Sequence, residues 1–159
     1  MTTKIPMHCA IALVLLWAGA ITPALAQQPV DIVADEMEIL EGGKTTVFKG
    51  HVVARREKQV MSCPEMVITN TDVKQADGTT QSEADVMDCT GDSIITTESQ
   101  RISGKKAKLY IRRDELVVSG DVTVREGKTV MRGQELTTDL KTKRTLMKGG
   151  RVRGTFVPK

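Results

Sequence analysis

The sequence has few of the residues that enzymes use for catalysis. It contains two histidines, His8 and His51, and the first lies in a segment that we expect to be removed. A Ser-His-Asp triad would depend on His51 alone, and a metal centre with two histidine ligands is excluded. The sequence has no phosphate loop, no Gly-x-Ser-x-Gly motif and no His-Glu-x-x-His motif. We therefore expect no enzymatic activity, no cofactor and no metal site.

Aromatic residues are also scarce, at 3% of the chain. Beyond the N-terminal segment they are Phe48, Tyr110 and Phe156, too few to stack successive bases of a nucleic acid. Residues 27–159 hold 22 basic and 20 acidic side chains, far from the excess of positive charge that a phosphate backbone requires. Nucleic acid is therefore not an expected partner.

The N-terminus has the layout of a secretory signal. Lys4 precedes an apolar run from Ala10 to Ile21, which is followed by Pro23 and by Ala24-Leu25-Ala26. As a helix this run would rise only about 18 Å, less than the roughly 30 Å hydrocarbon core of a bilayer. We expect residues 1–26 to be a cleavable signal peptide and residues 27–159 to form a single domain; an uncleaved anchor is the alternative.

Two cysteines remain after the signal, Cys63 and Cys89. An even number of thiols in an oxidising compartment permits one disulfide, and two buried free thiols are the alternative. No Cys-x-x-Cys motif accompanies them, which argues against a redox or metal-binding role.

Two short motifs each occur four times. The first has a large apolar residue, then a small residue two positions later, in Ile32–Met37, Met61–Met66, Ile102–Ala107 and Met131–Leu136, and the small residues are 29, 41 and 29 apart. The second is a glycine between strand-forming residues, at Gly50, Gly91, Gly120 and Gly150, which are 41, 29 and 30 apart. The second repeat therefore contains an insertion, which we place in the polar stretch 70–82 around the turn signal Asp77-Gly78. Such a period indicates repeated units that bury one face by stacking on their neighbours.

Within each repeat, apolar residues alternate as in β-strands. The residues predicted to share one face are Thr46, Phe48, Gly50, Val52 and Ala54 in the first repeat, Leu116, Val118, Gly120, Val122 and Val124 in the third, and Leu146, Lys148, Gly150, Val152, Gly154 and Phe156 in the last. A glycine in mid-strand indicates a bulge, a bend or close packing. We predict an all-β fold, a twisted and partly open antiparallel β-jellyroll built from repeated short strands.

These motifs, in the order Val30–Asp35, Val47–Val52 and Arg151–Pro158, resemble the LptA/OstA-like family of lipopolysaccharide-transport proteins, over about residues 28–158. The resemblance implies an OstA-like V-shaped β-jellyroll in the periplasm that assembles end to end. It implies the function of a lipopolysaccharide carrier that links an inner-membrane Lpt complex, including LptC, to the outer-membrane protein LptD. The implied partners are therefore the lipid A moiety of lipopolysaccharide, LptC, LptD and further copies of the chain in a head-to-tail homo-oligomer.

Each methylene that is kept out of water contributes about 0.8 kcal/mol, so a carrier of acyl chains needs an apolar lining. The residues that we predict to line this groove are Val30, Ile32, Met37, Ile39, Phe48, Val52, Met66, Ile95, Leu109, Ile111, Leu116, Val118, Val122 and Leu136. The same alternation would also produce an ordinary sealed core, which stays open as the alternative.

The first and last strands of a partly open jellyroll have unpaired edges, here expected near residues 30–34 and 151–157. Another copy can add a strand at such an edge, and the resulting contact does not close on itself. Basic residues cluster at Arg55-Arg56-Lys58, Arg112-Arg113 and Lys141-Lys143-Arg144, where lipid phosphates would be attracted and solvated surface charge is the alternative. Two other functions remain open at this stage: a structural β filament with a sealed core, and an LptC-like accessory protein that retains residues 1–26.

Overall fold

The structure is a computed structural model, and it describes residues 29–157. These residues form one antiparallel sheet of ten strands in the order β1-β3-β4-β5-β6-β7-β8-β10, with β2 also paired to β3 and β9 also paired to β8. The strands are β1 (Asp31–Val33), β2 (Glu36–Leu40), β3 (Thr45–Arg56), β4 (Gln59–Lys74), β5 (Thr80–Thr96), β6 (Gln100–Tyr110), β7 (Glu115–Glu126), β8 (Thr129–Asp139), β9 (Arg144–Lys148) and β10 (Arg153–Thr155). Two 3-10 turns, η1 (Glu41–Gly43) and η2 (Ile111–Arg113), are the helical elements within the described part of the chain.

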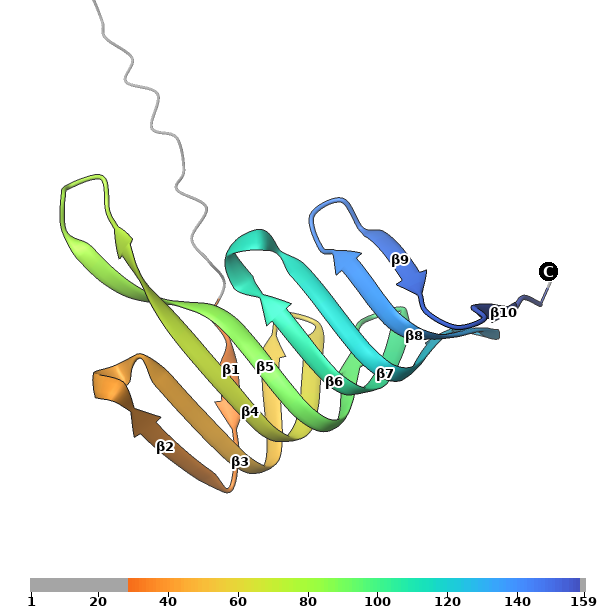
Figure 1. Cartoon of the computed structure of the whole chain (residues 1–159), viewed down its shortest axis with the longest axis horizontal. Helices are drawn as coiled ribbons and strands as arrows, with labels where there is room; N and C mark the ends of the chain where they lie inside the picture. The colour runs from red at the N-terminus through yellow and green to blue at the C-terminus, as the bar shows by residue number, and fades with distance from the viewer. Residues whose placement is uncertain (1–28, 158–159) are drawn as a thin grey trace, which may run out of the picture.

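Each long strand bends near its middle, so the sheet folds into a trough with two walls (Figure 1). We call wall A the wall that contains β2 and β9, and wall B the wall that contains β1 and β10. Strand β3 shows the arrangement, because its half Thr45–Lys49 pairs with β2 and its half Val53–Arg55 pairs with β1. The predicted fold class, a partly open antiparallel β-jellyroll, is therefore confirmed.

At each bend, the glycine of the second motif lies against a residue of the first motif in a neighbouring strand segment. Register shifts interrupt the pairing between Lys49 and Val52 in β3 and between Ser119 and Val122 in β7. The glycine at each bend has a positive φ, and a Cβ placed on it would touch the residue that follows the small residue of the first motif. These pairs are Gly50 with Asp35, Gly91 with Pro64, Gly120 with Lys105, and Gly149 with Gln134. The prediction that these glycines mark bends or bulges is confirmed for the first three repeats.

The last repeat differs from the prediction by one residue. The glycine at its bend is Gly149, which contacts Gln134, and not Gly150. Because a slip of one residue moves the side chains of a strand to the opposite face, the prediction that Leu146 and Lys148 face inward was wrong. Gly154, from the same predicted set, pairs with the inward Met131. Met147 packs against the core, whereas Leu146 is 44% exposed.

The insertion of the second repeat extends one hairpin. The end of β4 pairs with the start of β5 from Asn70 opposite Ala84 to Lys74 opposite Thr80, and Gly78 in the connecting turn has a φ of +86°. The position predicted for the insertion is therefore confirmed. The hairpin projects beyond the neighbouring strands of wall A (Figure 1).

Candidate functional site

The inner faces of both walls carry apolar residues in rows that cross the whole sheet. Directly paired residues of antiparallel strands project to the same face, so the strand register defines each row. The main row of wall A runs through Met37, Phe48, Met66, Cys89, Ala107, Val118, Leu136 and Met147. The main row of wall B runs through Ile32, Ala54, Met61, Ile95, Ile102, Val124, Met131 and Gly154. We call the space between these two rows the groove.

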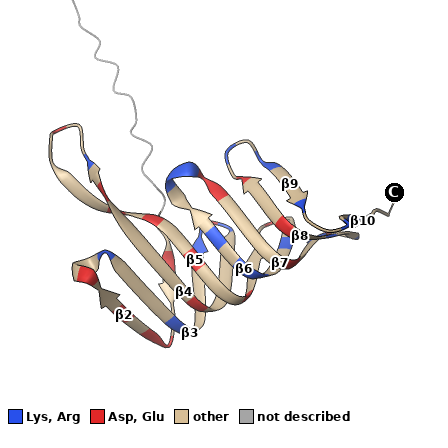
Figure 2. Cartoon of the chain, in the orientation of Figure 1, with Lys and Arg blue, Asp and Glu red and all other residues tan. Residues whose placement is uncertain are grey.

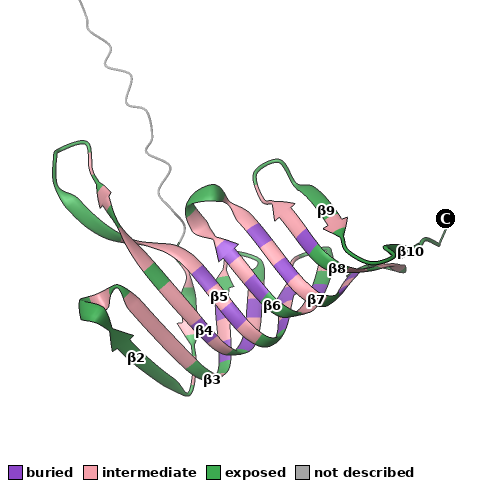
Figure 3. Ribbon diagram, in the orientation of Figure 1, coloured by how far each residue is buried: buried purple, intermediate pink, exposed green. Residues whose placement is uncertain are grey.

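The groove is packed in its middle and less covered at its two ends, where Met37 is exposed and Met147 is partly buried. Met66, Val118 and Leu136 are completely buried, because strands on both sides and the facing wall cover them. Met37 on β2 continues the row of Met66 but is 61% exposed, since no further strand covers it among the described residues. Figure 3 shows the buried residues along the central strands and the exposed ones at β2 and β9.

All the large hydrophobic residues that are exposed in the described chain lie near the two edges of the sheet. They are Val33, Met37, Ile39 and Leu40 at the β1–β2 edge, and Leu146, Val152, Phe156 and Val157 at the β9–β10 edge. Exposed apolar residues gathered at the edges of a sheet are typical of surfaces that bind a partner.

An apolar pocket opens from the groove where the free ends of the two walls approach each other. Its apolar lining consists of Val30, Ala54, Val60, Met61, Met87, Ile95, Ile102, Leu109, Leu116 and Leu140. Among the residues that line it, Arg56 is the one that carries a charge. The pocket therefore has an apolar interior, and the guanidinium of Arg56 lies at its opening.

Four charged groups lie at this opening, those of Arg56, Glu57, Asp114 and Lys141, and three of them approach one another. Nη1 of Arg56 is 4.0 Å from Oδ1 of Asp114, and Nζ of Lys141 is 3.4 Å from Oδ2 of the same carboxylate. Arg56 ends β3 in wall B, whereas Asp114 and Lys141 belong to the turns before β7 and before β9 in wall A. The carboxylate of Asp114 thus connects the two walls at the open side of the trough.

The structure brings most of the predicted lining residues together. Eight of them are buried in the core between the walls: Val52, Met66, Ile95, Leu109, Leu116, Val118, Val122 and Leu136. Four are partly buried and pack against this core: Val30, Ile32, Phe48 and Ile111. The remaining two, Met37 and Ile39, are exposed at the β1–β2 edge.

Sequence reasoning missed other residues of the same surface. Ala54, Met61, Met87, Ile102 and Leu140 line the pocket. The alternation along the first repeat already placed Ala54 beside Val52, and that signal was available. Leu140 belongs to a turn, and its position depends on a backbone hydrogen bond from its N–H to the carbonyl oxygen of Asp114 (2.7 Å), which no local pattern predicts.

Each edge of the sheet contains a second strand that the prediction did not include. The strands β1 and β10 fall in the expected segments, and β2 and β9 lie beside them along the same edges.

At the bend of the first edge, Nδ1 of His51 is 2.7 Å from Oδ2 of Asp35. This hydrogen bond, with the negative charge of Asp35, raises the pKa of the exposed His51.

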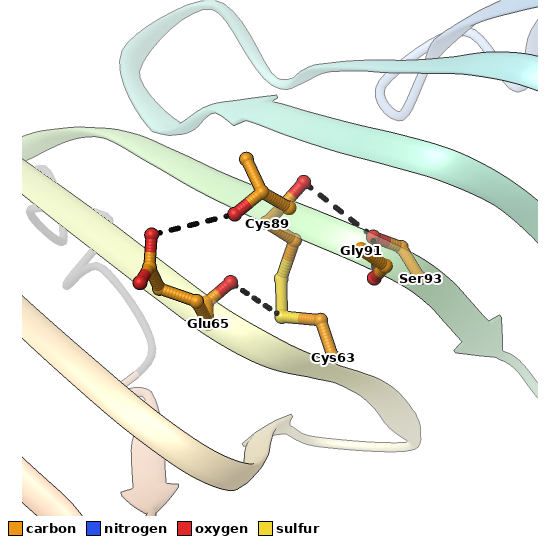
Figure 4. Close-up of a disulfide and its surroundings, with 6 residues drawn as sticks. Cys63, Glu65, Cys89, Gly91 and Ser93 are labelled. Carbon is orange, nitrogen blue, oxygen red and sulfur yellow. Dashed lines mark hydrogen bonds between the residues drawn. A yellow bond between two sulfur atoms is a disulfide. The ribbon is translucent and has the colours of Figure 1, made fainter.

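Cys63 and Cys89 are joined by a disulfide, with their Cα atoms 6.0 Å apart. The bond connects the neighbouring strands β4 and β5 beside the bend (Figure 4). Both cysteines are buried in the core between the walls.

Two further kinds of feature are absent from the described part of the chain. Residues 29–157 contain no group of three or more His, Cys, Asp or Glu side chains placed to hold a metal ion. They also contain no helix with the length and apolar character needed to cross a membrane.

These features define a class of protein, that of curved and open β-jellyrolls with an apolar groove between two walls. The LptA/(LptD N-terminal domain) LPS transport protein family matches residues 31–144, and the chain belongs to this family.

A solved structure shares the fold. It is the crystal structure of LptH from Pseudomonas aeruginosa, described as the LptA homologous periplasmic component of the conserved lipopolysaccharide transport device. The TM-score is 0.71 at 12% sequence identity, and the match covers 82% of this chain and 96% of LptH. A search of curated protein sequences finds no match.

Proposed function

We propose that this chain carries lipopolysaccharide across the periplasm by shielding its acyl chains in the groove. The observation that carries the proposal is the pair of apolar rows that cross the sheet. The row of wall A is buried in its middle, 61% exposed at Met37 on β2 and only partly buried at Met147 on β9. Several acyl chains that are kept out of water gain about 0.8 kcal/mol for each buried methylene. Because the middle of the groove is filled by side chains, the two walls separate when a lipid occupies it.

The periplasmic location has support from two features. The layout of residues 1–26, which lie outside the described part of the chain, is that of a secretory signal. The disulfide between Cys63 and Cys89 suits an oxidising compartment.

The two edges support a bridge built from several protein units. The segment 31–41 of the first edge contains five acidic residues and no basic one: Asp31, Asp35, Glu36, Glu38 and Glu41. The segment 141–153 of the last edge contains six basic residues and no acidic one: Lys141, Lys143, Arg144, Lys148, Arg151 and Arg153. Figure 2 shows this contrast between the two ends of the trough.

Opposite charges at two exposed strand edges favour head-to-tail pairing, in which the β9–β10 edge of one copy docks on the β1–β2 edge of the next. Such pairing would continue the groove from one copy to the next. An LptC-type partner of the inner-membrane complex and LptD of the outer membrane would then occupy the free edges at the two ends.

Photocrosslinking in cells tests the carrier function. We expect a photoreactive residue at Met37 or Ile39, on the groove face of β2, to form adducts with lipopolysaccharide. Glu38 lies between them on the opposite face, so the same residue at Glu38 is the matched control. Adducts at Glu38 equal to those at both groove positions, or no adduct at either groove position, would contradict the proposal and favour a structural filament.

A further inference from the structure

The groove explains where acyl chains would lie, but lipid A also carries phosphate groups that need a polar partner. Of the three basic clusters in the sequence, the first and the third each place one residue, Arg56 and Lys141, at the opening of the pocket. Arg55 and Arg56 are neighbours on β3 and therefore project to opposite faces, and only Arg56 lines the pocket. Lys58 is paired with Glu98 instead.

The side chain of Arg113, in the second basic cluster, interacts with two other residues. The guanidinium of Arg113 lies 3.8 Å above the ring centre of Tyr110, and its Nε is 3.9 Å from Oε2 of Glu115. Neither Arg112 nor Arg113, the two residues of the second basic cluster, lines the pocket. The positively charged groups at the opening are therefore those of Arg56 and Lys141.

Resting on the function proposed above, we propose that Arg56 and Lys141 bind a phosphate group of the carried lipid, and that Asp114 occupies their site when no lipid is bound. The carboxylate of Asp114 is 4.0 Å from Arg56 and 3.4 Å from Lys141. Both distances exceed the 2.7–2.9 Å that is typical of strong charge-assisted hydrogen bonds. A phosphate has more acceptor oxygens than a carboxylate and matches the planar guanidinium in a bidentate geometry.

The position of Arg56 couples this site to the groove. Its side chain is 27% exposed, and it continues the inward row of Val52 and Ala54 to the mouth of the pocket. A lipid with its acyl chains in the pocket would thus place its phosphate beside Arg56. Displacement of Asp114 would also release the ion pair that connects wall A to wall B.

The positive and negative charges at the opening are equal in number, so the phosphate must compete with carboxylates for the two cations. Glu57 and Asp114 contribute two carboxylates beside the two cations. Because Asp114 competes with the phosphate for the same cations, loss of its charge strengthens lipid binding. Loss of the charge of Arg56 weakens it.

Binding of purified full-length protein to lipid A with its phosphates, and to fully dephosphorylated lipid A, separates these effects. For Arg56→Gln we expect affinity for the phosphorylated lipid to fall about tenfold, the size of one charge-assisted hydrogen bond, with no change for the dephosphorylated lipid. For Asp114→Asn we expect tighter binding of the phosphorylated lipid. Arg55→Gln, on the outer face, is the matched control and should equal the wild type.

Opposite shifts for Arg56→Gln and Asp114→Asn support the site, because a purely structural role of the ion pair would make both variants weaker. Shifts in the same direction, or an equal loss for both lipids, overturn it. Inorganic phosphate alone should not displace the lipid at millimolar concentration; if it does, the site binds free phosphate and the proposal is wrong. Failure of the wild type to bind dephosphorylated lipid A would instead reject the carrier function, and circular dichroism checks that each variant is folded.

Discussion

At the residue scale, the shape of the trough depends on a few backbone positions in the left-handed region. In three repeats two consecutive residues have positive φ values: Gly50 with His51, Gly120 with Asp121, and Gly149 with Gly150. Glycine adopts this region without strain, and His and Asp tolerate it better than most other residues. These pairs turn each strand from one wall into the other.

Substitution of a bend glycine should therefore cost more than substitution of a turn glycine. In Gly120→Ala the new Cβ would lie 2.7 Å from Cβ of Lys105, at a φ of +81°, and we expect a loss of about 3 kcal/mol from backbone strain and overpacking together. Gly127 also has a positive φ (+54°), but nothing lies within 4 Å of its Cβ position. Gly127→Ala should lose only about 1 kcal/mol. Urea denaturation measures the free energy of unfolding of both variants. Equal losses would show that the contact with Lys105 does not contribute to the cost of Gly120→Ala.

At the scale of elements, the sequence allowed the strands, the bends and the inserted hairpin to be predicted, because their signals are local. The inward face of β9 was not predicted correctly, since Gly149 and Gly150 both fit the motif and a slip of one residue reverses the inward face. The local sequence pattern also does not predict which inward residues are exposed. Met37 and Met66 lie in one row, but Met37 is at an edge and exposed, whereas Met66 is in the middle and buried. The approach of Arg56 to Asp114 depends on how the two walls face each other, which strand alternation does not determine.

The longest hairpin, β4–β5, is held by the one disulfide in the described chain. The bond closes a loop of 26 residues, which in the chain-entropy model stabilises the fold by about 3 kcal/mol. We expect Cys63→Ala/Cys89→Ala to lose about this amount in a urea titration under oxidising conditions. A reductant should reduce the stability of the wild type toward that of the variant and leave the variant unchanged. An unchanged midpoint for the double variant would mean that packing alone holds the hairpin.

At the scale of the whole molecule, acidic residues gather at one edge of the sheet and basic residues at the other. A dimer formed by identical edges would place like charges opposite each other, whereas a head-to-tail contact pairs opposite charges at every junction. The charge distribution therefore gives the assembly a direction, in addition to the strand pairing that gives it strength.

Charge reversal tests this polarity. Glu36→Lys/Glu38→Lys on the first edge, or Lys148→Glu/Arg151→Glu on the last, should weaken self-association about tenfold, since each exposed pair contributes up to about 1 kcal/mol. A mixture of the two variants should regain association in alternating order, because one variant then has two basic edges and the other has two acidic edges, and every junction between unlike chains pairs opposite charges. The four-fold variant carries both reversals in one chain and should regain association by itself. Analytical ultracentrifugation at low and high salt measures the effect, and Lys106→Glu, on the central strand β6, controls for net charge. If the four-fold variant associates no better than either parent, strand pairing without charge complementarity must account for the polymer.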